Sequence, residues 1–144
     1  MNSFLADANV WLALSHDRHV HHDAARAWFD SNESPIYFCR ITQLALLRLL
    51  TNPRVMTTAV KTHIEAWQIY DGLRAHLRVA FAAEPWNIEV ILRELTKTRK
   101  YSPNTWTDAY LGAMARALEL RIVTFDSDFR AMPGVDAVVL TQVH

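Results

Sequence analysis

The chain has 144 residues, with 15 basic and 15 acidic side chains and a formal net charge of zero. This length fits one domain with a real hydrophobic core, and 51% hydrophobic with 21% charged residues is typical of an ordinary globular protein. A zero net charge excludes a uniformly basic nucleic-acid coat, although it leaves room for a local basic patch.

Short apolar runs alternate with amphipathic segments along the chain, which predicts strands and helices in turn. The expected strands are residues 3–7, 36–39, 79–82, 121–125 and 137–140, and the expected helices are residues 10–15, 22–31, 42–51, 58–76, 84–100 and 108–120. Short strands joined by helices favour a parallel sheet with right-handed crossovers. The predicted fold class is therefore α/β, with a central sheet of about five short strands flanked by helices in one domain, residues 1–144.

The sequence also predicts the compartment of the protein. Residues 1–7 lack a charged segment followed by a sustained apolar one, so we expect no signal peptide. No uncharged apolar stretch reaches the length of a membrane span, so we expect no membrane contact. The single cysteine, Cys39, excludes an internal disulfide and fits a reducing environment. Together these features predict a cytoplasmic protein.

Four aspartates follow or precede the expected strands. Asp7 ends the first strand, Asp126 and Asp128 follow the fourth, and Asp108 opens the Ala-rich helix before it. Each alone can be explained as a helix cap or a first-turn acid. If the two strands are neighbours, however, their carboxyl ends share one edge of the sheet, where α/β folds build their sites. Gathered carboxylates repel one another unless protons or cations neutralise them, and their oxygens suit Mg²⁺ or Mn²⁺.

The chemistry expected of such a cluster is phosphodiester hydrolysis by a metal-activated water. Asn9 and Thr124 are candidates to orient the carboxylates through hydrogen bonds. Arg48, on the expected helix 42–51, is a candidate to hold the substrate backbone. Trp106 lies beside Asp108 in the sequence, where it either packs in the core or stacks on an unpaired base. The other helical tryptophans are expected in the core: Trp11, Trp28, Trp67 and Trp86.

Segments along the whole chain resemble a known family. Those that carry the acids are residues 5–11 (LADANVW), 107–111 (TDAYL) and 123–129 (VTFDSDF), and two more are residues 19–28 (HVHHDAARAW) and 41–55 (ITQLALLRLLTNPRV). In this order they resemble PIN-domain ribonucleases, in particular the VapC-type toxins of bacterial toxin–antitoxin pairs abundant in mycobacteria. The resemblance implies a PIN-like fold, an endoribonuclease that uses Mg²⁺ or Mn²⁺, a dimer, and inhibition by a cognate antitoxin.

By the same resemblance, Asp7, Asp108 and Asp126 are the metal-site acids, with Asp128 an optional fourth. One departure from the family stands in the segment 41–45, where a Glu is usual. Depending on the register, its place is taken here by Gln43 or Ala45. Gln43 can still hydrogen-bond a metal-bound water, but it supplies no negative charge. We therefore expect a weaker metal site, with one metal bound in the absence of RNA.

Two other functions remain open from the sequence. A phosphohydrolase of the haloacid-dehalogenase type would use Asp7 as its nucleophile, but Asn9 stands where a second acid is expected and no lysine is convincingly placed. The other alternative is a binding module, in which a nuclease fold weakened by the missing Glu holds RNA or an antitoxin without cutting.

Overall fold

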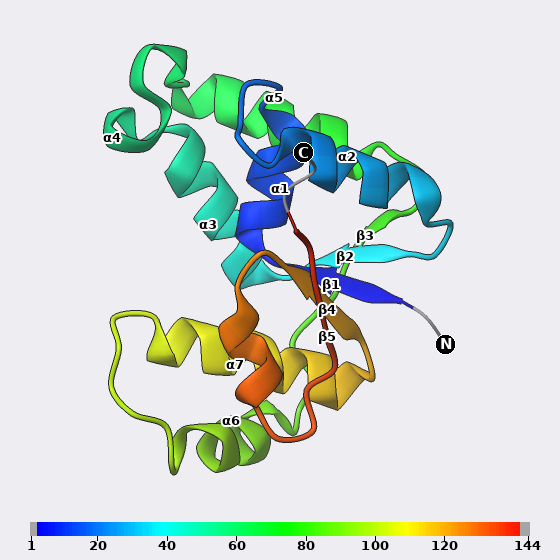
Figure 1. Ribbon diagram of the computed structural model, residues 1–144, viewed down its shortest axis with the longest axis vertical. Helices are drawn as coiled ribbons and strands as arrows, with labels where there is room; N and C mark the ends of the chain where they lie inside the picture. Colours follow the sequence, from blue (N-terminus) through cyan, green and yellow to red (C-terminus); the bar gives the residue numbers. More distant parts are fainter. Residues whose placement is uncertain (1–2, 142–144) are drawn as a thin grey trace.

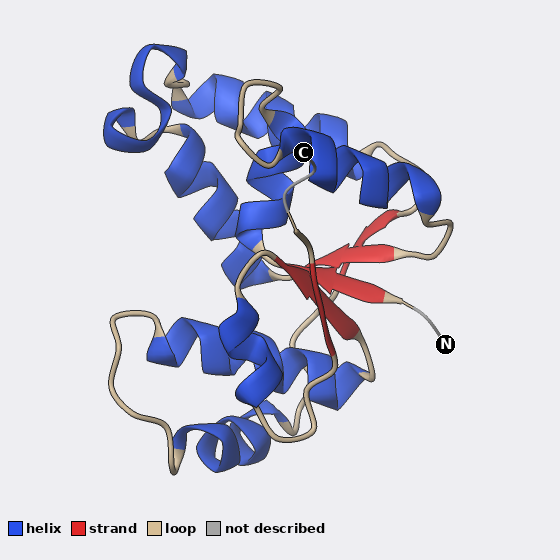
Figure 2. Cartoon of the chain, in the orientation of Figure 1, coloured by secondary structure: helices blue, strands red, loops and turns tan. Residues whose placement is uncertain are grey.

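One sheet of five parallel strands runs through the computed structural model, which describes residues 3–141. The strands are β1 (Phe4–Ala6), β2 (Ile36–Phe38), β3 (Val79–Phe81), β4 (Arg121–Thr124) and β5 (Ala137–Val139), in the spatial order β3-β2-β1-β4-β5. Every neighbouring pair is parallel, as Figure 2 shows. The predicted α/β class and parallel sheet are confirmed. Residues 1–2 and 142–144 lie outside the described residues. They belong to the predicted domain, and residues 1–2 also belong to the segment in which no signal peptide is expected.

Helices cover both faces of this sheet. The helices are α1 (Ala8–Ser15), α2 (His22–Ser31), α3 (Arg40–Leu50), α4 (Pro53–Met56), α5 (His63–Arg74), α6 (Ile88–Thr96) and α7 (Thr105–Leu118), with 3₁₀ turns η1 (Thr57–Ala59) and η2 (Ser127–Ala131). In Figure 1, α1, α2, α3 and α5 lie on one side of the sheet, and α6 and α7 on the other. None of the helices in residues 3–141 is long and apolar enough to cross a membrane.

Two hydrophobic cores explain why the short strands are apolar throughout. Successive side chains of a strand point to opposite faces, so both faces need apolar residues when both are covered. In β1, Phe4 and Ala6 pack into the core beneath α1, α2 and α5, whereas Leu5 packs into the core beneath α6 and α7. In β4, Val123 joins the first core and Ile122 the second. The sheet is thus buried on both faces around β1 and β4.

The strand order reverses beside β1, and this reversal positions the site. The chain passes from β1 to β2 and β3 on one side, and then returns to β4 and β5 on the other. The register pairs Ala6 with Val123, so the two strands end together. A crevice forms at such a switch point because the helices that follow the two strands lie on opposite faces. Asp7 and Asp126 stand at the ends of these strands.

The segment between α3 and α5 differs from the prediction of a single helix over residues 58–76. The side chain of Asn52 accepts a hydrogen bond from the Arg54 amide, so the residue expected to end one helix also begins another, α4. The chain breaks again at Thr57, where φ is 52°. Thr62 then caps α5 through a reciprocal pair of hydrogen bonds with Glu65. This Thr-x-x-Glu capping box was the sequence signal for the true helix start.

The tryptophans expected in the core divide into two groups. Trp11 is fully buried and stacks on Phe38 with ring centroids 3.8 Å apart, and Trp28 is half-buried. Trp67 and Trp86 are 47% and 95% exposed, so their expected burial was wrong. Trp67 lines an open hollow between α5 and α3, and Trp86 lies in the turn before α6 because that helix begins only at Ile88. Apolar neighbours in sequence do not bury a side chain outside the helix face that packs.

Candidate active site

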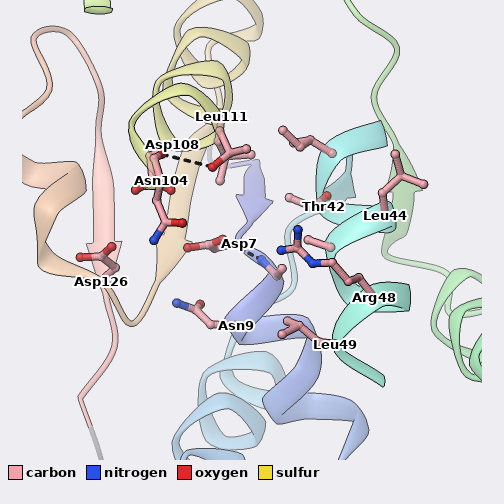
Figure 3. A pocket seen from close by; sticks show the side chains of 14 residues that line it. Asp7, Asn9, Thr42, Leu44, Arg48, Leu49, Asn104, Asp108, Leu111 and Asp126 are labelled. Carbon is pink, nitrogen blue, oxygen red and sulfur yellow. Dashed lines mark hydrogen bonds between the residues drawn. The ribbon is translucent and has the colours of Figure 1, made fainter. Parts of the chain in front are cut away.

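A cavity of about 600 Å³ lies at the carboxyl ends of β1 and β4, between α3 and α7. Asp7, Asp108 and Asp126 line it together, although they come from three distant parts of the chain. Figure 3 shows these acids on one side, with Arg48 extending from α3 on the other. The sequence predicted this convergence, because parallel strands end at the same edge.

Asp7 is held through both of its carboxylate oxygens. Its Oδ1 accepts a hydrogen bond from the Ala8 amide at 2.8 Å, which caps α1. Its Oδ2 accepts a hydrogen bond from the Thr124 hydroxyl, also at 2.8 Å. The capping role and the site role therefore coexist in one side chain. This double attachment aims the carboxylate of Asp7 along the edge of the sheet.

Thr124 and Asn9 connect the two strand ends, as their predicted orienting role requires. The Thr124 hydroxyl accepts hydrogen bonds from the Asp126 amide at 3.0 Å and from Asn9 Nδ2 at 3.4 Å. With its donation to Asp7, this hydroxyl uses its one proton and both lone pairs. Asn9 Oδ1 in turn accepts a hydrogen bond from the Phe125 amide at 3.4 Å. The network fixes the spacing between Asp7 and Asp126.

Burial and mutual repulsion make negative charge costly in this cavity. Burial raises the pKa of Asp7 above its usual range, against the hydrogen bonds from Thr124 and Ala8. Burial also raises the pKa of Asp108 to about 6, and the charges of Asp7 and Asp126 act in the same direction. The Arg99 guanidinium lowers the Asp108 pKa only in part. The site therefore favours whatever positive charge can enter it.

The match to a family model decides what kind of domain this is. Residues 4–135 match the model described as "PIN domain". The chain belongs to the PIN-domain family. Curated relatives include ribonuclease VapC41 of Mycobacterium tuberculosis, which is 40% identical over 96% of this chain and 99% of its own, and ribonuclease VapC44 of the same organism, which is 35% identical over 90% and 92%.

Solved structures share the fold of this PIN domain at lower identity. VapBC2 from Rickettsia felis, in a crystal structure with a promoter DNA fragment, aligns with a TM-score of 0.72 over 96% of this chain and 99% of the matched chain at 13% identity. VapC20 of Mycobacterium tuberculosis, described as a toxin that cleaves the sarcin-ricin loop, aligns with a TM-score of 0.66 over 92% and 98% at 18% identity. At these identities the likeness concerns the fold alone.

Two residues expected in the site lie outside the cavity of this PIN domain. Asp128 is exposed and borders a separate hollow, because its amide donates to Asp126 Oδ1 at 2.9 Å and turns the chain away through η2. Gln43 is 5% exposed and accepts a hydrogen bond from Arg40 at 2.6 Å, in a hollow on the other side of α3. Neither the optional fourth acid nor the predicted glutamine lines the acidic cavity, although the charge of Asp128 still contributes to the raised pKa of Asp108.

Ala45 lines the acidic cavity, and this decides the register left open by the sequence. Gln43 lines a different hollow, with Arg40 and Tyr70, so of the two candidates only Ala45 faces the acids. Position 45 is therefore where a family glutamate would join the acids of this PIN domain. Sequence reasoning missed other lining residues, including Asn104 and Thr107 at the start of α7. Their signal was the turn-forming Ser102-Pro103-Asn104 run, which also marks the helix start three residues before Asp108.

The carboxylate oxygens of the cavity are suitable ligands for a hard divalent cation, although they do not lie close enough together to form a complete metal site. Within residues 3–141, no three His, Cys, Asp or Glu side chains form a group that could hold a metal ion as they stand. The three aspartates nevertheless offer hard oxygen ligands, and burial raises the pKa values of Asp7 and Asp108, so negative charge is costly there until a cation offsets it. Ala45 contributes no ligand, so waters or substrate oxygens would have to complete the coordination sphere.

The pKa of Asp108 predicts an unusual pH dependence of stability. Its folded-state pKa of about 6 exceeds the ordinary 3.8, so the folded protein binds more protons between these values. Stability without metal should therefore fall as the pH rises from about 4 to about 6. We expect Asp108→Asn to raise the free energy of unfolding at pH 7 by about 1 kcal/mol, because solvent screens part of the penalty.

Urea unfolding in EDTA at several pH values measures this effect. The gain from Asp108→Asn should vanish near pH 4, where the wild-type carboxyl is also neutral. The matched control is Asp17→Asn, which changes an exposed loop carboxylate. A gain that is the same at every pH would contradict the raised pKa of Asp108.

Proposed function

We propose that this PIN domain is a Mg²⁺- or Mn²⁺-dependent endoribonuclease and the toxin of a toxin–antitoxin pair. The observation that carries the proposal is the convergence of Asp7, Asp108 and Asp126 in one cavity at the switch point of the sheet. Curated relatives that align with nearly the whole chain are named ribonucleases, which supports RNA as the substrate. The proposed reaction is hydrolysis of RNA phosphodiester bonds.

A divalent cation, when bound, would lower the pKa of the attacking water and offset the charge that develops on the phosphate. The residues that line the cavity would hold and orient this cation. Asp7, Asp108 and Asp126 would hold the cation, and Thr124 keeps the Asp7 carboxylate aimed through its hydrogen bond. The raised pKa values of Asp7 and Asp108 also support the proposal, because a cation would offset the burial and the repulsion between acids that raise them.

Arg48 is a positively charged residue of the cavity and can attract the RNA backbone, which the acids alone would repel. It lines the cavity from α3, and it makes no ion pair with the described residues. Its planar guanidinium suits a phosphate oxygen pair. We propose that Arg48 holds a backbone phosphate of the RNA on the wall opposite the acids, so that the scissile phosphate lies between them.

An exposed apolar surface on α3 to α5 supports protein partners. Its large exposed hydrophobic side chains are Leu44, Val55, Val60, Ile64 and Trp67. Leaving large apolar side chains in water is unfavourable, so their number on this segment favours an interaction site there. VapBC complexes among the structural neighbours support a cognate antitoxin as one partner, and a second copy of this chain as a homodimer is the other. The proposed location of the pair is the cytoplasm.

The two alternatives are weaker but remain separate outcomes. The family assignment favours a nuclease over a phosphohydrolase of the haloacid-dehalogenase type, and no lysine lines the acidic cavity within residues 3–141. The binding module remains an alternative because Ala45 leaves the metal site one carboxylate short.

Incubation of the purified protein with total cellular RNA, followed by mapping of the new ends, tests the proposal. We expect discrete internal cleavage sites with Mg²⁺ or Mn²⁺ and none with EDTA. Addition of the antitoxin encoded beside the toxin should suppress them. RNA binding without cleavage in either metal would support the binding module instead. Release of phosphate from small phosphomonoesters, without RNA cleavage, would support the phosphohydrolase.

A further inference from the structure

We propose that Trp106 and the neighbouring cations of α6 form a subsite for one unpaired nucleotide of the RNA, outside the acidic cavity. The inference rests on the proposed function, because it assigns a second contact to the same RNA strand. Trp106 is 66% exposed, which excludes the core position left open by the sequence. It does not line the acidic cavity either. The ring is therefore open to a ligand, one helical turn or less from an acid of the candidate nuclease site.

The surroundings of Trp106 have the composition of a nucleotide site. A hollow of about 580 Å³ lies between α6 and the start of α7, lined by Glu89, Leu92, Arg93, Thr96, Lys97 and Trp106. Leu92 and Thr96 are partly buried in it, whereas the two cations, Arg93 and Lys97, are exposed. Arg93 reaches Glu89 only at 3.8 Å, with both side chains about 80% exposed, so this pair is weak. Lys97 makes no ion pair within residues 3–141.

The subsite adjoins the acidic cavity through the first turn of α7. Asn104, Thr107 and Asp108 line the acidic cavity, while Trp106 lies between them in sequence and lines the hollow. Two residues along a helix separate side chains by about 200° around the axis and only about 3 Å along it. Trp106 and Asp108 therefore lie on opposite sides of the same helix end. A strand that crosses this end can contact both within a few nucleotides.

Single-stranded RNA is the occupant that fits this chemistry best. Aromatic stacking requires the face of a base, and paired bases inside a duplex do not offer theirs. Cations beside an aromatic ring match the alternation of base and phosphate along a strand.

Binding measured without cleavage tests the subsite. In EDTA, fluorescence anisotropy gives the Kd of the protein for a labelled single-stranded oligoribonucleotide and for a matched duplex. We expect Trp106→Ala to weaken single-strand binding about tenfold and duplex binding little, and Trp106→Phe to keep most of the affinity. Lys97→Ala should weaken binding and reduce its salt dependence. The matched control is Trp86→Ala, since Trp86 is 95% exposed in the turn before α6 and lines no part of the hollow.

The outcomes separate the subsite from the proposed function. If Trp106→Ala binds single-stranded RNA as tightly as the wild type, and the wild type cuts RNA, only the proposed subsite is overturned. Wild-type protein that binds through Trp106 but cuts nothing in Mg²⁺ or Mn²⁺ overturns the endoribonuclease and leaves the subsite standing. Loss of antitoxin binding with unchanged RNA binding would assign Trp106 to the protein partner and overturn the subsite. Thermal melting of Trp106→Ala checks that the variant is folded, as expected for so exposed a side chain.

Discussion

Replacing Asp7 with Asn is expected to reduce the rate of RNA cleavage about a thousandfold in saturating Mg²⁺. Asn keeps an oxygen that can accept the Ala8 amide, so the cap on α1 survives. It removes the negative charge, however, and its amide group cannot accept the Thr124 proton as Oδ2 does. The change therefore acts on the charge and aim of this one group rather than on the fold. Single-turnover cleavage of an RNA with a mapped cleavage site measures the loss.

Two comparisons make this result specific. Asp17→Asn removes an exposed carboxylate from the loop after α1 and should leave cleavage within about twofold of the wild type, because surface charges lie far from the reaction. Thermal unfolding in EDTA should show Asp7→Asn folded and no less stable than the wild type, since burial penalises the charged form. Metal-dependent cleavage at the wild-type rate by pure Asp7→Asn protein would falsify the assignment of Asp7.

Replacing Ala45 with Glu is expected to tighten Mn²⁺ binding about tenfold or more, because affinity for hard cations rises with the number of charged oxygen ligands. Ala45 already lines the cavity that holds Asp7, Asp108 and Asp126. A carboxylate there would be the fourth acid of the cluster. Without metal, the added charge should destabilise the protein, since it increases repulsion among buried acids. Isothermal titration with MnCl₂ gives the affinity and the stoichiometry.

Gln43→Glu is the matched control for this gain of affinity. It adds the same charge on the same helix, but beside Arg40 and away from the acids. We expect its Mn²⁺ affinity to equal that of the wild type. Equal tightening by both variants would mean that a general increase in negative charge, rather than position 45, controls the affinity. Ala45→Gln, which adds an oxygen without charge, should give an intermediate result.

Local sequence was enough for most of the elements, and the failures have identifiable causes. α2 has the predicted bounds, and each predicted strand agrees with the structure within a residue or two. These segments have clear boundaries because each is apolar or amphipathic throughout and ends at turn-forming residues. The sequence predicts no helix directly after Asn52, because a proline follows it and proline interrupts a helix. Proline at the first position of a helix also starts one, as it does in α4.

The aspartates of the candidate site were predictable for a related reason. Asp7 and Asp126 directly follow apolar strands, and in a parallel sheet the ends of neighbouring strands must share one edge. Asp128 was not separable from Asp126 by this reasoning, since both follow β4. Only the turn at η2, in which the Asp128 amide donates to Asp126, sends the second carboxylate away from the cavity. Backbone hydrogen bonding of a short turn is not visible in composition or periodicity.

The parallel α/β architecture could be predicted from the sequence because each strand and helix has its own pattern, and the shared edge of Asp7 and Asp126 followed from placing the first and fourth strands side by side. Only the tertiary structure decided that Ala45, and not Gln43, faces these acids. The rotation of α3 about its axis is set by Leu46 and Leu50, which are buried in the core shared with α1 and α5. The packing of these two leucines therefore determines which residue of α3 faces the cavity. That packing depends on α1 and α5, so it cannot be predicted from the sequence of α3 alone.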